Sequence, residues 1–341
     1  MSDLPQGLEK FLSDAGWGGS NIEPIPGDAS FRRYFRIRKT DGTAPSTAML
    51  MFAPPPEEDP KPFLKVATWL SEKGFRAPEV YHEIASEGWV LTEDFGDDRM
   101  REWIEFYPSG QLGAYTSAVE VLSKLSKCEP GPFPPYDMAV YHREVGLFTE
   151  WYCDAMGLDV DKDGFFAAWT EVLEPVIAAQ SPGVTVLRDY HSENIMMLAP
   201  ETGGHKLGRG EQGLIDFQDA LVGHPAYDLV SLLQDARRDV SPEVERQLLD
   251  AYVLDGDLGE GIDPNFEADY ARLGAQRNAK IVGIFTRLYK RDGKSRYLDL
   301  IPRVWEAMER DLAHPAMAPV AHWFDANIPA ELRKSHGGKV A

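Results

Sequence analysis

Residues 187–197 have the sequence LRDYHSENIMM, and residues 213–219 have the sequence GLIDFQD. They place one aspartate at position 189, an asparagine five residues later, and a second aspartate after two apolar residues. Phosphoryl transfer uses such a set, because one carboxylate accepts a hydroxyl proton while other oxygen ligands hold Mg²⁺. The pattern therefore predicts Asp189 as the proton acceptor, and Asn194 and Asp216 as the metal ligands.

A second interpretation of this segment is a loop whose polar side chains bond to one another or cap turns. Burying three oxygen-bearing side chains between apolar strands is costly without a function, which favours the first interpretation. The supporting strands are predicted from the apolar runs at 184–187, 195–198 and 213–217.

The N-terminal part of the chain alternates between apolar and polar side chains. Over residues 31–38, Phe35 and Ile37 face one way, and Arg32, Tyr34, Arg36 and Arg38 face the other, which predicts a half-exposed strand. An Asp-Gly turn and an apolar run at 47–53 follow, so the two segments are expected to form a hairpin. The same rules predict helices over 5–15 and 61–73, and strands over 79–85 and 89–92.

The rest of the chain is mostly helical by the same criteria. Apolar residues recur at helical spacing over 109–127, 138–156, 163–180, 242–255, 265–290 and 296–312. The predicted fold class is therefore α+β and bilobal. A small antiparallel-sheet lobe spans residues 1–95, a large mostly helical lobe spans residues 96–341, and a cleft is expected at their join.

Composition and charge exclude several classes of protein. The 341 residues include 35 lysines and arginines against 55 aspartates and glutamates, a formal net charge of −20, so general binding to nucleic acid or to an anionic membrane is not expected. Two cysteines are too few for a disulfide framework or a structural zinc site. The start of the chain lacks signal-peptide features, and no stretch approaches roughly 20 apolar residues. A cytoplasmic protein is expected.

Three segments carry a family resemblance. The sequence from Asp189 to Asn194, the aspartate at 216 and the residues GHPAYDL at 223–229 resemble the aminoglycoside phosphotransferase and choline kinase branch of the protein-kinase-like fold. The likeness extends over most of the chain, from residue 27 to residue 310. It implies ATP and Mg²⁺ as cofactors, Asp189 as the catalytic base, and Asn194 and Asp216 as magnesium ligands.

A narrower resemblance rests on GDASFRRYFR at 27–36, DFQDA at 216–220 and QDAR at 234–237. These segments are similar to the anomeric kinases of bacterial cell-wall recycling, which phosphorylate N-acetylmuramate and N-acetylglucosamine at C1. The implied partner is a small sugar, and a monomer is expected. The implied contacts to the sugar are Arg188, His191, Gln218 and Asp219.

Each of these sugar contacts has an alternative. For His191 a hydrogen-bond strut for the loop is the favoured alternative, and Arg188 either steers an anionic substrate or pairs with an acidic neighbour. Gln218 and Asp219 also suit turn capping. Asp228 follows Pro225 at the start of a helix, so a capping or loop-bracing role is expected for it.

The nucleotide site departs from the kinase pattern in two places. By the resemblance, Glu93 and Phe95 lie in the hinge whose backbone meets adenine. No G-x-G-x-x-G motif precedes the second strand, so Ser30 and Phe31 are expected to cover the phosphates instead. The strand at 47–53 also lacks the lysine that grips the phosphates in kinases. The candidate replacements are Arg33, Lys61 and Lys65, of which Arg33 is favoured because a guanidinium clasps phosphate with two hydrogen bonds.

The function that these patterns predict is an ATP-dependent small-molecule kinase. One alternative is a kinase of another small alcohol or of an aminoglycoside. A second is a nucleotide-binding pseudokinase, because the strand lysine is absent. A third is a metal-dependent phosphoesterase that uses Asp189, His191, Asp216 and His224 as its ligands.

Overall fold

A computed structural model describes residues 4–26, 31–198, 211–255 and 266–340. Its contacts divide the chain into two compact units. Of the described residues, unit 1 holds 4–26, 31–106, 193–198 and 211–219, and unit 2 holds 107–192, 220–255 and 266–340. The main difference from the expected lobes, 1–95 and 96–341, is that residues 193–198 and 211–219 group with the sheet. Backbone hydrogen bonds explain this grouping, since Met197 N donates to Asp98 O and Leu214 N donates to Arg76 O.

Unit 1 is built on a five-stranded antiparallel sheet with strand order β1-β2-β3-β5-β4. Its strands are β1 (Asn21–Ile25), β2 (Arg33–Arg38), β3 (Thr47–Phe52), β4 (Val80–Ile84) and β5 (Trp89–Glu93). The predicted hairpin is confirmed, with Tyr34 opposite Met51. Strand β1 was not predicted, because Pro24 interrupts its pattern. Proline is tolerated there because β1 is an edge strand.

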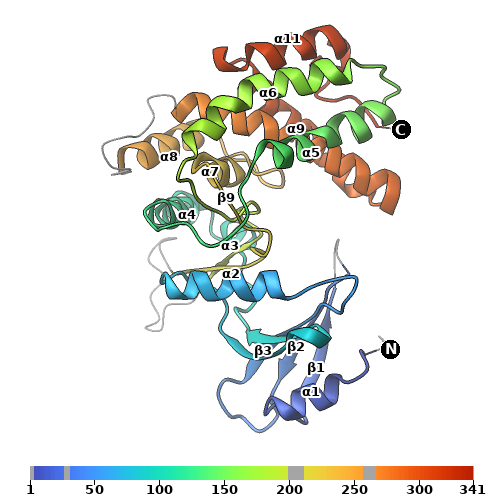
Figure 1. The fold of residues 1–341 in the computed structure, drawn as a ribbon. Helices are drawn as coiled ribbons and strands as arrows, with labels where there is room; N and C mark the ends of the chain where they lie inside the picture. The colour runs from blue at the N-terminus through green and yellow to red at the C-terminus, as the bar shows by residue number, and fades with distance from the viewer. Residues whose placement is uncertain (1–3, 27–30, 199–210, 256–265, 341) are drawn as a thin grey trace. The chain divides into compact units, whose positions relative to one another are not determined.

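Helices cover both faces of this sheet (Figure 1). On one face, α1 (Leu8–Asp14) packs with Phe35, Leu50 and Trp89. On the other, α2 (Lys61–Glu72) brings Phe63 and Leu64 against Met51 and Val90. Unit 1 also contains α3 (Met100–Phe106) and a small ladder of β7 (Ile195–Met197) with β8 (Gln212–Leu214). Side chains that alternate along β2 therefore lie under different helices.

Unit 2 is mainly helical, as predicted. Its helices are α4 (Gln111–Ser126), α5 (Met138–Leu147), α6 (Lys162–Ala179), α7 (Ala226–Leu233), α8 (Pro242–Asp255), α9 (Phe266–Asp292), α10 (Ile301–Leu312), α11 (Ala318–Asn327) and α12 (Ala330–Lys334). A π-helical segment, Phe148–Cys153, continues α5, and β6 (Val184–Val186) pairs with β9 (Leu221–Gly223). Short 3-10 helices lie at Ala85–Glu87 in unit 1 and at Pro108–Gly110, Ser295–Leu300 and Pro315–Met317 in unit 2.

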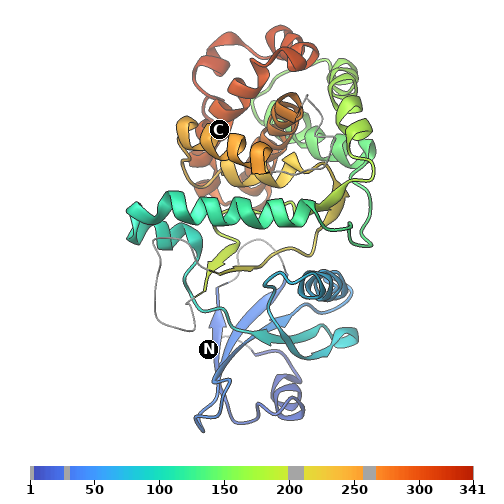
Figure 2. The ribbon, with the colours of Figure 1, turned by 90° about the vertical axis from the view of Figure 1, so that its left-hand side faces the viewer.

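The long helix α9 organises unit 2, because α5, α7 and α10 all pack against it (Figures 1 and 2). A glycine at 283 permits the close approach of the chain at the end of α5. A Cβ atom at that position would lie 2.3 Å from the carbonyl carbon of Leu147. No helix in the described parts of the chain combines the length and apolar character needed to cross a membrane.

The prediction that the arginines of β2 face solvent is wrong for Arg36, which is only 6% exposed. Its Nε lies 2.8 Å from a carboxylate oxygen of Asp94, and its guanidinium also donates to Asp97 and to the carbonyl of Gly96. These acceptors follow β5, so the ion pairs join β2 to the segment after β5. Burial of a charge is tolerated here because a carboxylate accompanies it.

We predict that Arg36→Met lowers the free energy of unfolding by about 3 to 5 kcal/mol, because it leaves the Asp94 carboxylate buried without its counter-ion. The Asp94 side chain is only 4% exposed. Urea unfolding at neutral pH measures the change. Arg38→Met is the matched control, since Arg38 pairs with Glu23 in solvent and its loss should cost less than about 1 kcal/mol. Equal losses for the two variants would contradict the assignment.

Candidate active site

The two predicted metal ligands lie side by side in unit 1. Asn194 directly precedes β7 and Asp216 follows β8, and these strands pair with each other. The Asn194 Nδ2 lies 3.3 Å from Asp216 Oδ2, and the Ile215 N–H donates to the Asn194 carbonyl. Strand β8 ends at Leu214, earlier than the predicted 217, because Asp216 adopts a left-handed backbone with φ of 60°.

The chemistry of these two side chains fits Mg²⁺. An ionised carboxylate and an amide carbonyl are hard oxygen donors, and magnesium commonly takes one or two protein ligands together with substrate phosphates and water. No cluster of three His, Cys, Asp or Glu side chains with a metal-binding arrangement occurs among the described residues. Two such ligands suit a metal that takes its other ligands from a nucleotide and water. Asp216 is exposed, so its carboxylate is accessible to such a complex.

The residues after Asp216 secure its position. Phe217 is buried and stacks on Phe63 of α2, with ring centroids 5.2 Å apart and planes inclined by 12°. Gln218 donates its Nε2 to Asp216 Oδ1 at 3.0 Å. The side chain of Gln218 thus holds the carboxylate of Asp216, as a turn-capping residue would. Asp219 is exposed, and its contact with a sugar stays a prediction.

The predicted hinge residues are fixed by an arginine that was not singled out in the sequence. Arg76 donates Nη1 to Glu93 Oε2 at 2.6 Å, and its guanidinium lies 4.9 Å above the centre of the Phe95 ring. The same ring packs against Gly213 of β8, where a Cβ atom would lie 2.6 Å from Phe95 Cε2. Both side chains therefore have structural roles, and adenine contact through the hinge backbone stays a prediction.

Of the two residues expected to cover the phosphates, Ser30 and Phe31, the structure describes only Phe31. Phe31 is 76% exposed, and its backbone N–H donates to Glu58 at 3.2 Å. Ser30 lies outside the described residues.

Asp189 lies in unit 2, in a loop that a buried aspartate braces. Asp228 of α7 accepts the N–H of Leu187 at 2.6 Å and the N–H of Arg188 at 2.8 Å. These bonds hold Arg188 in a left-handed backbone conformation with φ of 70°, which is unfavourable for a residue with a side chain. The expected loop-bracing role of Asp228 is confirmed. Burial raises the pKa of Asp228 to about 7, although both N–H groups oppose the rise.

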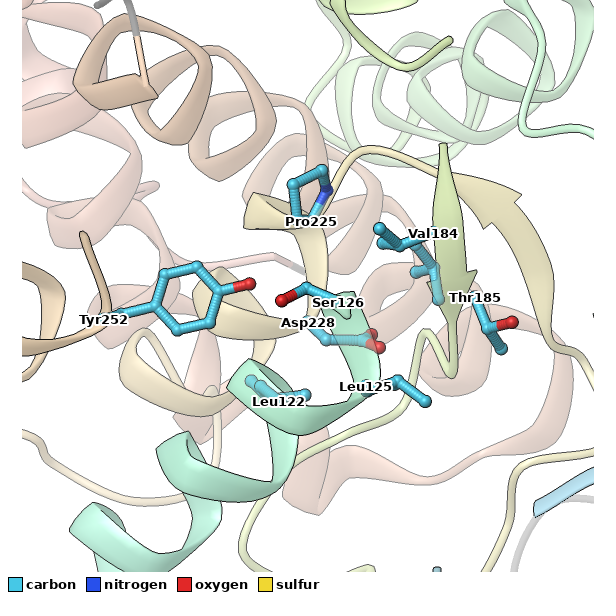
Figure 3. Close-up of a pocket in the computed structure, with 9 residues that line it drawn as sticks. Leu122, Leu125, Ser126, Val184, Thr185, Pro225, Asp228 and Tyr252 are labelled. Atoms are coloured by element: carbon cyan, nitrogen blue, oxygen red, sulfur yellow. The ribbon is translucent and has the colours of Figure 1, made fainter. Parts of the chain in front are cut away.

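Asp228 also borders a small pocket between α4, β6 and α7 (Figure 3). The lining is mostly aliphatic, and Asp228 contributes the one carboxylate in it. The lining residues are Leu122, Leu125, Ser126, Val184, Thr185, Val186, Pro225, Asp228 and Tyr252. Because this carboxylate already accepts two backbone N–H groups and no cation lines the pocket, the pocket does not suit a phosphate.

Cations gather around Asp189. Burial alone would raise the pKa of Asp189, but the charges of Lys280, His191 and Arg277 hold it below its ordinary value. Lys280 and Arg277 come from α9, where they are one turn apart. The Lys280 Nζ lies 3.0 Å from Glu144 and donates to the Tyr227 hydroxyl at 3.2 Å.

The remaining predicted sugar contacts are built into the fold of unit 2. Arg188 pairs with Glu144 of α5, which is the acidic-neighbour alternative. His191 is only 4% exposed, and its Nε2 lies 3.3 Å from Arg237 Nη1, which favours the strut alternative. Sequence patterns missed Glu144 and Lys280, although charged residues within the apolar pattern of two predicted helices are a signal of buried pairing.

Comparison with known proteins identifies the class. The phosphotransferase enzyme family matches residues 21–264. The chain is 33% identical to an N-acetylmuramate/N-acetylglucosamine kinase of Caulobacter vibrioides, over 95% of this chain and 96% of that protein. It is 34% identical to a protein of the same name from Pseudomonas aeruginosa, over 94% and 93% of the two chains. The chain belongs to the phosphotransferase enzyme family, as the sequence motifs predicted.

Solved structures support the fold. A choline/ethanolamine kinase family protein from Mesorhizobium loti matches with a TM-score of 0.59 at 14% identity, over 94% of this chain and 97% of that one. The ADP-bound aminoglycoside phosphotransferase APH(2'')-Ib matches with a TM-score of 0.55 at 14% identity, over 90% and 97% of the two chains. The predicted protein-kinase-like fold class is therefore confirmed.

We predict that Asp228→Ala destabilises the protein by about 3 kcal/mol or more, because two backbone N–H groups lose their buried acceptor. Chemical unfolding at pH 8, where the carboxylate is ionised, measures the loss. Asp239→Ala is the control, since Asp239 is an exposed partner of Arg303 and its loss should cost less than about 1 kcal/mol. If the two variants are equally stable, Asp228 does not brace the loop.

Proposed function

We propose that this chain is an ATP-dependent sugar kinase that transfers the γ-phosphate to the anomeric C1 hydroxyl of N-acetylmuramate, N-acetylglucosamine or both. The proposal places the enzyme in the re-use of cell-wall sugars. The main support for this function is sequence identity to two proteins that are named as kinases of these sugars. The identities are 33% and 34%, over more than nine tenths of the chain. Membership of the phosphotransferase family supports the reaction class.

In this proposal Asp189 accepts the proton of the acceptor hydroxyl as its oxygen bonds to the γ-phosphorus. The bond between that phosphorus and the β–γ bridging oxygen breaks, and ADP leaves. Asn194 and Asp216 hold Mg²⁺, which supplies positive charge to the phosphates when it is bound. The cations near Asp189 make it a weak base, because they lower its pKa. A weak base suits a hemiacetal hydroxyl, which is more acidic than an ordinary alcohol.

The environment of two histidines weighs against the phosphoesterase alternative. The His224 Nδ1 accepts the N–H of Ala226 at 3.2 Å, and its Nε2 lies 3.3 Å from Asp269. Both ring nitrogens of this buried side chain therefore have protein partners. His191 is buried beside Arg237, whose charge disfavours a nearby cation. A metal ligand needs a ring nitrogen available for coordination.

We predict that the purified protein, with ATP and Mg²⁺, converts N-acetylmuramate or N-acetylglucosamine to the 1-phosphate. Phosphorus NMR of the product distinguishes a glycosyl 1-phosphate from a 6-phosphate. Choline, homoserine and kanamycin are the control acceptors, and they should accept no phosphate. A 6-phosphate would contradict the anomeric assignment. Transfer to a control acceptor alone would identify a different small-molecule kinase, and nucleotide binding without any transfer would identify a pseudokinase.

A further inference from the structure

One ion pair in unit 1 lies beside the strand position at which protein kinases carry a lysine that contacts the nucleotide phosphates. The strand β3 contains no lysine, and the side of β3 that faces α2 carries Met51. Tyr34, directly opposite Met51 in the ladder, donates its hydroxyl to the Met51 sulfur at 3.5 Å. Protein kinases place at this strand a lysine that pairs with a glutamate of the neighbouring helix and contacts the phosphates. Another residue must supply that charge if the chain transfers phosphate.

Arg32 and Glu58 form an ion pair beside this position. The Arg32 Nε lies 3.0 Å from Glu58 Oε2, and the Phe31 N–H donates to Glu58 Oε1 at 3.2 Å. The two side chains are only 17% and 14% exposed. Glu58 lies just before α2, so the pair links the start of β2 to the segment that leads into that helix. A basic side chain directly before β2 and an acidic partner just before α2 are thus both present.

The surroundings of Tyr34 place this pair close to a predicted metal ligand. Tyr34 packs in the cluster of Met51 and Phe63 on the α2 face. Burial raises the pKa of the Tyr34 hydroxyl, the charge of Arg32 opposes the rise, and the charge of Asp216 adds to it. The stack of Phe63 on Phe217, the residue after Asp216, supports the same placement.

Arg33, which the sequence favoured for this role, lies on the opposite face. Its guanidinium is 5.2 Å from the centre of the Phe35 ring, and Phe35 belongs to the cluster that packs under α1. Lys61 and Lys65 are exposed on α2. The alternation of side chains along a strand explains why adjacent arginines separate in this way.

We propose that Arg32 contacts the phosphates of the bound nucleotide in place of the missing strand lysine, with Glu58 holding its guanidinium in position. This inference rests on the proposed kinase function. A guanidinium carries five N–H donors, so it can keep the Nε bond to Glu58 and also bind phosphate oxygens. Glu58 is a positioning residue in this scheme, because it acts on the nucleotide through Arg32.

The test compares Arg32→Gln with Arg33→Gln in the full-length protein. Calorimetry with Mg²⁺·ADP gives the affinity for a phosphate-bearing ligand, and adenosine, measured in competition, gives the affinity without phosphates. We expect Arg32→Gln to weaken ADP binding by about tenfold or more, because a charge-assisted phosphate contact is lost. Its affinity for adenosine should stay within about twofold of the wild type, and Arg33→Gln should change neither affinity beyond that. Glu58→Gln should weaken ADP binding by a smaller factor.

The adenosine measurement separates a phosphate contact from a structural role. If Arg32→Gln weakens ADP and adenosine binding alike, Arg32 stabilises the fold of the sheet and the inference is wrong. It is also wrong if ADP binding is unchanged, or if Arg33→Gln is the variant that loses ADP. Sugar phosphorylation by the wild type is measured separately. Loss of ADP binding in Arg32→Gln supports the inference even if the wild type transfers no phosphate to a sugar, since the readout is nucleotide affinity.

Discussion

The carboxylate of Asp228 makes the interaction on which the predicted catalytic loop depends. It accepts the N–H groups of Leu187 and Arg188, and so stabilises a left-handed residue directly before Asp189. The Arg188 side chain, turned by that backbone, pairs with Glu144 of α5. The loop is therefore attached to two helices of unit 2. A general base, the role proposed for Asp189, requires a fixed orientation, and these bonds fix the neighbouring backbone without using the side chain of Asp189 itself.

The charges around Asp189 are opposite in sign to the net charge of the chain. The formal charge is −20, yet Lys280, Arg277 and Arg188 all lower the pKa of Asp189. Buried cations of this kind keep a carboxylate ionised at neutral pH, because burial alone would favour its protonated form. In unit 1, Asn194 and Asp216 form a small oxygen-donor pair. In the proposed reaction, Asp189 of unit 2 is the base, and Asn194 and Asp216 of unit 1 are the magnesium ligands.

Sequence patterns predicted the elements whose signals are local. The hairpin of β2 and β3 follows from alternation and a turn, and the contact of Asn194 with Asp216 follows from the two short strands beside them. The joint role of residues 189, 194 and 216 stays a prediction. Partners that are distant along the chain could not be predicted. Arg36 is 58 residues from Asp94, and Arg188 is 44 from Glu144, so neither burial nor pairing is visible in a local pattern. Which of Arg32 and Arg33 faces α2 depends on the alternation of side chains along the strand, and a shift of one residue exchanges the two faces.

The most direct test of the central claim, that Asp189 is the base of a phosphotransferase, is the kinetic and binding analysis of Asp189→Asn with ATP, Mg²⁺ and the sugar that the wild type accepts. The asparagine preserves shape but cannot take a proton. The account predicts that nucleotide affinity is unchanged while kcat falls by about 10³-fold or more. Retention of more than about a tenth of wild-type kcat, or loss of nucleotide affinity together with turnover, would contradict it.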